Sequence, residues 1–196
     1  IIHKGRLVGE SYVTGNEGGP IKWTAQTCND MKSSTKSVFG TGVGVFLDDY
    51  KDQVNLDSYL VGDSRESSLI PQIWDQPITD EAKKHIKVKH VLSMTSGHAG
   101  PESWLGTGTR RHHPGYLGAF QMHEYCFGWW NFEGVASHET LLFEPGSDFM
   151  YSNFGMEQMA LAIRNIAGTD LGPYTYDKVL GPIGMTVETW FANQHA

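Results

Sequence analysis

The sequence predicts an α+β protein in which a short strand pair precedes several helices. Apolar residues recur at helical spacing after Ser33 and again after Tyr151, which indicates two helices. Within the first 14 residues, two short apolar runs flank turn residues, which predicts a β-hairpin. With 196 residues and 39% apolar content, the chain is long enough for one domain, or for one and part of another.

The hairpin and the first helix follow from local patterns. Residues 1–14 read as a strand, a turn at Lys4-Gly5-Arg6 and a second strand that reaches Val13. Residues 31–47 carry apolar side chains along one helical face, and Ser and Thr at the start are typical of an N-cap. Three glycines lie inside this helix, and each costs about 1 kcal/mol relative to alanine. We therefore expect a buried helix with another element pressed against the glycines, which are Gly40, Gly42 and Gly44.

Residues 48–168 are predicted to form further helices joined by loops and turns. Residues 48–79 are expected to form loops and short helices, and residues 86–97 a helix that ends in a glycine cap at Gly97. Residues 100–138 are rich in Gly, His and aromatic side chains without a lasting period, which predicts a loop. After a turn at Glu144-Pro145-Gly146-Ser147, residues 156–166 have a clear helical period that Gly168 closes.

Charge and hydropathy exclude two kinds of partner. The net charge of −7 and the short basic segments argue against nucleic-acid binding. No apolar run approaches the roughly 18 residues that a membrane helix needs. The two cysteines, Cys28 and Cys126, could form one disulfide or none, so the cellular compartment stays open. His112, His113, His123 and Cys126 lie close in sequence, but without a zinc-binding motif, so we expect no metal.

Ser33 and Lys36 have the spacing of a nucleophile and its base. A serine hydroxyl is a poor nucleophile at neutral pH and needs a neighbouring base. Positions i and i+3 share one helical face, so the amine of Lys36 can reach the Ser33 hydroxyl. The helix N-terminus adds N–H groups beside the oxygen that becomes negative during attack. The spacing S-x-x-K occurs often by chance, and a capped helix with an exposed lysine is the alternative.

A second motif makes the pattern specific. The segment E-P-G-S-D-F-M-Y-S-N at residues 144–153 leads into the helix that Gly168 closes. This arrangement resembles the Y-x-N motif of class C β-lactamases, D-Ala-D-Ala carboxypeptidases and related esterases, whose first motif is S-x-x-K. Residues 86–97 and 181–189 are similar to two further stretches of that family, in the same order along the chain.

The resemblance implies a fold and roles for four residues. The fold would be β-lactamase/transpeptidase-like, a helical lobe packed on an antiparallel sheet with flanking helices. Ser33 matches the nucleophile, Lys36 the motif lysine, Tyr151 a proton-transferring phenol, and Asn153 the amide that holds Lys36 and the substrate. The family needs no metal or organic cofactor, and its substrates are small esters, amides or β-lactams. The aromatic loop would border the substrate site.

One part of the family pattern is missing. A third motif, Lys or His followed by Ser or Thr and Gly on an inner strand, is expected after Gly184-Met185, and residues up to Ala196 do not contain it. Residues 1–196 are therefore expected to form a partial domain with an incomplete sheet. Two functions remain: a serine acyl hydrolase, or a catalytically inactive homologue that acts as a binding or structural subunit of an assembly.

Overall fold

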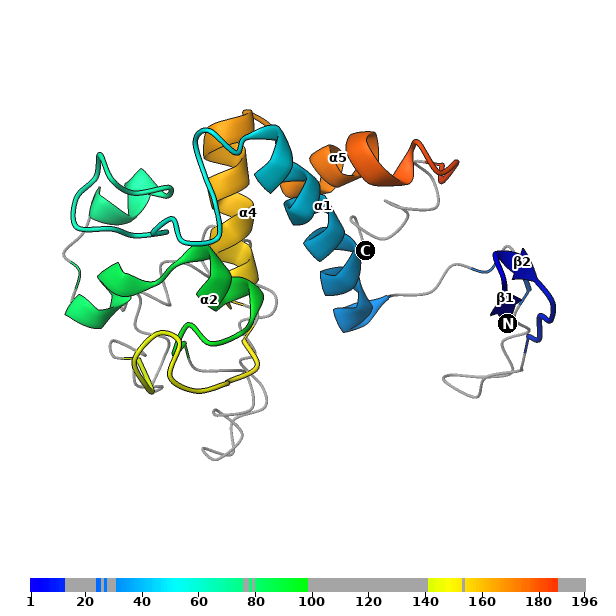
Figure 1. Cartoon of the computed structure of the whole chain (residues 1–196), viewed down its shortest axis with the longest axis horizontal. Coiled ribbons are helices and arrows are strands. Elements are labelled where there is room, and N and C mark those ends of the chain that lie inside the picture. The colour runs from blue at the N-terminus through cyan, green and yellow to red at the C-terminus, as the bar shows by residue number, and fades with distance from the viewer. Residues whose placement is uncertain are drawn as a thin grey trace. The chain divides into compact units, whose positions relative to one another are not determined.

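The computed structural model describes residues 1–12, 24, 25, 27, 31–75, 78, 80–98, 141–152 and 154–186. The chain divides into two compact units, residues 1–32 with 185–196 and residues 33–184, which are described separately. The first contains the hairpin and the second the helices (Figure 1).

The predicted hairpin is confirmed, although its strands are shorter than expected. Strand β1 (Ile2–His3) pairs antiparallel with β2 (Arg6–Leu7), with Ile2 opposite Leu7. Lys4 and Gly5 form the two-residue turn, and both have positive φ, as a type I′ turn requires. Tyr12 lies outside the strands. Among the described residues, this two-stranded hairpin is the antiparallel sheet, which is consistent with the incomplete sheet expected from the sequence.

The first predicted helix is confirmed as α1 (Thr35–Asp49), entered through a 3-10 turn, η1 (Lys32–Ser34). The expected side-chain cap is absent, because the N-cap residue Ser34 has helical φ and ψ and its side chain makes no cap hydrogen bond. Val43 and Phe46 are buried and face the core. At its end, Asp49 accepts a hydrogen bond of 2.7 Å from the Tyr174 hydroxyl, which ties α1 to α5.

Close packing accounts for one of the three glycines in α1. A Cβ added at Gly42 would lie 2.2 Å from Oγ1 of Thr175, a fully buried residue of α5 (Leu171–Thr175). Gly40 and Gly44 have nothing within 4 Å of such a Cβ. The element expected against the glycines is thus α5, and it requires a missing side chain at Gly42 alone.

Gly42→Ala is expected to lower the free energy of unfolding by about 1–3 kcal/mol, since buried Thr175 has little room to move. Gly44→Ala, the matched control, should raise the free energy of unfolding by about 0.4–1 kcal/mol, because alanine is the better helix former. Urea unfolding followed by circular dichroism measures both. Equal changes in the two variants would contradict the close approach of α5.

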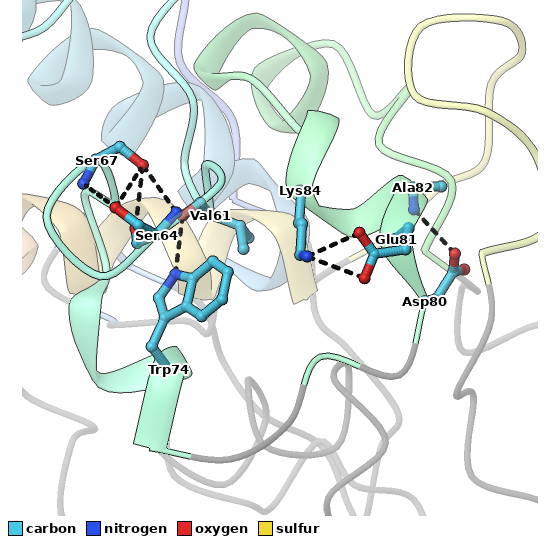
Figure 2. A network of polar contacts seen from close by, with 8 residues as sticks. All are labelled: Val61, Ser64, Ser67, Trp74, Asp80, Glu81, Ala82 and Lys84. Carbon is cyan, nitrogen blue, oxygen red and sulfur yellow. Dashed lines mark hydrogen bonds and ion pairs between the residues drawn. The ribbon is translucent and has the colours of Figure 1, made fainter.

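The described residues between 50 and 79 form loops and one 3-10 turn, η2 (Pro71–Asp75), as expected, and a second 3-10 turn, η3 (Glu81–His85), follows. Figure 2 shows the polar contacts that hold this segment. The Trp74 indole donates to the carbonyl of Val61 at 3.2 Å. Asp80 caps η3 by accepting from the amide of Ala82 at 3.0 Å. The segment therefore has fixed local structure without long helices.

The next helix, α2 (Val88–Leu92), ends earlier than predicted. The left-handed residue that caps the helix is Met94, with φ of 57°; Gly97 also has a positive φ, of 86°, but lies three residues further along the chain. The amide of Thr95 donates to His90 O at 2.8 Å and that of Met94 to Val91 O at 3.2 Å. These two bonds form a Schellman motif with methionine in the position that usually holds glycine. The glycine cap predicted at Gly97 is wrong.

The last predicted helix is confirmed as α4 (Phe154–Ala167), followed by Gly168 with φ of 69°. Beyond it lie α5 and a π-helical turn, η6 (Tyr176–Leu180), which the sequence did not indicate. Within unit 33–184, α1 packs against α5, and α2 against α4 (Figure 1). The core between them is apolar and fully buried, and includes Phe46, Leu60, Ile73, Ile86, Val91, Met159 and Ile163.

Candidate active site

Ser33 lies at the entrance to α1 and is exposed to solvent. It belongs to the 3-10 turn that precedes the helix, so its hydroxyl is one turn away from Lys36. The first turn of α1 carries no acidic residue. The positive end of this 15-residue helix is therefore not neutralised by a carboxylate of its own first turn.

The structure brings Ser33, Lys36 and Tyr151 together. Oγ of Ser33 and the hydroxyl oxygen of Tyr151 are 2.5 Å apart, within hydrogen-bond distance. Nζ of Lys36 donates to Oγ of Ser33 at 3.3 Å and lies 4.9 Å from the centroid of the Tyr151 ring. Lys36 and Tyr151 are both half-buried. The Ser33 hydroxyl thus contacts two titratable groups, the amine of Lys36 and the phenol of Tyr151.

Backbone hydrogen bonds to the segment after α2 position Tyr151. Residues 141–150 run beside residues 94–97, and three amides of the first segment donate to carbonyls of the second: Met150 to Met94 (3.0 Å), Gly146 to Thr95 (2.7 Å) and Leu142 to Gly97 (2.8 Å). The bond from Met150 is made by the residue immediately before Tyr151. The phenol is therefore placed by main-chain contacts rather than by a flexible loop.

Close contacts at Gly97 and Asp80 fix the same segment. A Cβ at Gly97 would lie 2.3 Å from the carbonyl oxygen of Phe143, so residues 141–143 can approach only a glycine. Asp80, whose cap of η3 appears in Figure 2, also accepts from the amide of Leu141 at 2.7 Å. Both contacts hold the start of the segment that leads to Tyr151.

The first turn of α4 is fixed against α2 and the residues after it. A Cβ at Gly155 would lie 3.0 Å from Cβ of Val91, so the helix approaches α2 closely here. Gln158 is fully buried, and its Nε2 lies 2.9 Å from Nε2 of buried His98. The position of His98, directly after the turn at Ser96-Gly97, predicts a solvated histidine, whereas His98 is buried against Gln158 of α4.

Glu157 is an acidic group beside the site that the sequence reasoning missed. It lies in the first turn of α4, six residues after Tyr151, and is half-buried. Burial raises the pKa of its carboxyl, and the nearby positive charge of Lys36 partly lowers it. A glutamate in a first helical turn is ordinarily explained by its favourable interaction with the helix dipole. Nothing in the sequence therefore indicates an interaction between Glu157 and Lys36.

Several predicted features lie outside the described residues. These are Asn153, both cysteines, the aromatic loop at 100–138, and the histidines at 112, 113 and 123. Within the described part of the chain, no cluster of three or more His, Cys, Asp or Glu residues could hold a metal ion. No helix of that part has both the length and the apolar character needed to cross a membrane.

Comparison with protein families gives one match over nearly the whole chain. The family model described as Beta-lactamase matches residues 1–195. No curated protein matches the chain.

Three solved structures share the fold. A candidate beta-lactamase from Bacteroides dorei DSM 17855 is 20% identical with a TM-score of 0.58, and the match covers 84% of this chain and 40% of that one. An octameric penicillin-binding protein homologue from Pyrococcus abyssi is 17% identical with a TM-score of 0.57, covering 86% and 33%. A D-stereospecific amidohydrolase from Streptomyces sp. is 18% identical with a TM-score of 0.53, covering 84% and 45%. The chain thus spans less than half the length of each.

Proposed function

This chain belongs to the beta-lactamase family, and from that premise we propose that it is a serine acyl hydrolase with Ser33 as its nucleophile. The observation that carries the proposal is the contact of one hydroxyl with an amine and a phenol, two groups that can take up a proton when deprotonated. Tyr151 lies 2.5 Å and Lys36 3.3 Å from Oγ of Ser33. A nucleophile in hydrogen-bond contact with its base is the geometry that covalent catalysis needs.

In the proposed reaction, Oγ of Ser33 attacks a carbonyl carbon and forms a C–O bond while its proton passes to Lys36 or Tyr151. The tetrahedral oxyanion lies against the N–H groups at the start of α1. The bond to the leaving group then breaks, and the same groups return the proton to that leaving group. Water cleaves the acyl-enzyme by the reverse sequence and frees Ser33. Asn153 is proposed to hold Lys36 and the substrate.

The proposed substrates are small carboxylic esters, β-lactams, or peptides and amides of D-amino acids. Each contains a carbonyl carbon that an acyl-enzyme mechanism can attack. Of the similar structures, one is named for D-stereospecific amide hydrolysis and another for penicillin binding. At 17–18% identity, these names favour the reaction class and do not rank the substrates.

A fluorophosphonate probe tests the proposal, because it reacts with activated serines and leaves a stable adduct. The full-length protein is expected to gain one adduct, and peptide mass spectrometry should locate it at Ser33. A slow-turnover penicillin tests the β-lactam class in the same way. Absence of any adduct at Ser33 would contradict the proposal and favour the inactive binding or structural subunit.

A further inference from the structure

His90 joins α2 to the turn at residues 144–147, which leads to Tyr151. Nδ1 of its ring accepts a hydrogen bond of 3.2 Å from the amide of Lys87, the N-cap residue of α2. On the side of the turn, a Cβ added at Gly146 would lie 3.1 Å from Nε2 of the same ring. The half-buried ring therefore bonds to the start of the helix with one nitrogen and packs on the turn with the other.

The backbone of His90 is tied to the same turn. Its carbonyl accepts from the amide of Thr95 at 2.8 Å, and the carbonyl of Thr95 accepts from the amide of Gly146 at 2.7 Å. Five residues after Gly146 comes Tyr151, whose hydroxyl oxygen lies 2.5 Å from Oγ of Ser33. A shift of His90 is therefore passed to the turn through both its ring and its main chain, and the turn leads directly to the phenol of the site.

We propose that His90 is a positioning residue for Tyr151 and that protonation of its ring loosens this placement at acidic pH. The inference rests on the proposed function. A backbone amide can only donate, so Nδ1 carries a lone pair and the neutral ring holds its proton on Nε2. Protonation places a hydrogen on Nδ1 as well, and the bond from the amide of Lys87 is then lost.

Charged groups act on the ring from α2 and from the loop after α1. Lys87 and Lys89 belong to α2, and Asp57 of the loop accepts from Nζ of Lys89 at 2.7 Å. From η3, the ring receives a backbone contact at His85. The turn presents a glycine to the ring, and its carboxylate, on Glu144, is exposed. A proton added to the ring would join two ammonium groups at the start of a helix, where the helix dipole also disfavours positive charge.

These surroundings favour the neutral ring. Burial and then the charges of Lys89 and Lys87 lower the pKa of His90, and Asp57 offsets part of this shift. Because the folded protein binds the proton less readily than the unfolded chain, the contribution to stability is fully present above the ordinary pKa of 6.5 and is lost as the pH falls through it. The bond to Lys87 is therefore intact at neutral pH and is lost as the ring is protonated below pH 6.5.

Capping of α2 is the competing explanation, because a side chain at the third helical position that accepts from the N-cap amide stabilises a helix. The two explanations differ in what they change. A cap alone changes the free energy of unfolding. A positioning residue also changes the rate at which the folded protein is acylated at Ser33.

Two substitutions separate the two contacts of the ring. His90→Asn keeps an acceptor close to the position of Nδ1 and cannot be protonated, whereas His90→Gln extends its amide towards the turn and loses the bond to Lys87. The second-order rate of Ser33 labelling by a fluorophosphonate is measured for both variants across pH in the full-length protein. His85→Asn is the matched control, because it removes an exposed histidine from η3.

The expected results depend on pH. At about pH 8, His90→Asn should react within about twofold of the wild type, and His90→Gln about fivefold more slowly, the worth of one hydrogen bond. Below pH 6.5 the wild-type rate should fall towards that of His90→Gln, so the ratio of His90→Asn to the wild type should rise to about fivefold. This ratio cancels the titration of groups that both proteins share. His85→Asn should follow the wild type at every pH.

The outcomes separate the two proposals. A ratio of His90→Asn to the wild type that stays constant across pH would overturn the role of His90. So would a loss of wild-type labelling that only parallels unfolding by circular dichroism, because the ring would then stabilise the fold alone. A wild-type protein that is not labelled at Ser33 at any pH would contradict the proposed function, and the inference would fall with it. Should His90→Gln fail to fold, the ratio of His90→Asn to the wild type decides by itself.

Discussion

Ser33→Ala is expected to abolish covalent labelling and to lower acyl transfer by about 10⁴-fold or more, because no other atom can form the acyl-enzyme. The substitution removes one exposed oxygen and leaves the fold intact, since Ser33 lies at the surface of its turn. Intact-protein mass spectrometry after incubation with fluorophosphonate measures the adduct.

Ser34→Ala is the matched control for this variant. Ser34 is the exposed neighbour of Ser33, and its hydroxyl makes no cap hydrogen bond to α1. The Ser34→Ala variant should therefore be labelled at Ser33 at the wild-type rate. An adduct that persists in Ser33→Ala would mean that another serine is the nucleophile.

The second large effect concerns the two groups that contact Oγ of Ser33. If Lys36 is the base, Lys36→Arg should slow acylation by roughly 10² to 10⁴-fold, because arginine stays protonated while keeping the positive charge. If Tyr151 is the base and Lys36 only supplies charge, Lys36→Arg should keep part of the rate and Tyr151→Phe should remove most of it.

Single-turnover acylation of both variants across pH separates these roles. Circular dichroism provides the folding control, because the phenyl ring of Tyr151→Phe retains the packing surface of tyrosine and loses the hydroxyl alone. Near-wild-type rates in both variants would refute proton transfer through this pair.

Local patterns predicted α1, α4 and the first half of the site. The α1 and α4 periods are properties of consecutive residues, and the contact from Lys36 to Ser33 follows from their spacing on one turn. Tyr151 could be included only through resemblance to a family, because nothing local places it beside a serine 118 residues away.

The features that sequence reasoning missed depend on distant neighbours. The end of α2 was expected at Gly97, yet Met94 adopts the left-handed conformation. A bond from the amide of Met150 to the Met94 carbonyl and the capping bond of Thr95 hold this turn, and the first partner is remote in sequence. Glu157 was missed for a similar reason, since its burial and its proximity to Lys36 appear only after α4 packs on α2.

The long separation between Ser33 and Tyr151 also bears on how the site is assembled during folding. Closing a flexible loop of 118 residues costs about 4 kcal/mol of chain entropy, whereas one hydrogen bond returns only about 1 kcal/mol. The hydroxyl pair therefore cannot bring its own segments together. Burial of apolar side chains where α1 packs on α5, and in the core that α1 shares with α4, must supply that free energy. The residues that would carry the reaction are therefore different from those that stabilise the fold. Substitutions that remove the proposed activity can leave the fold intact.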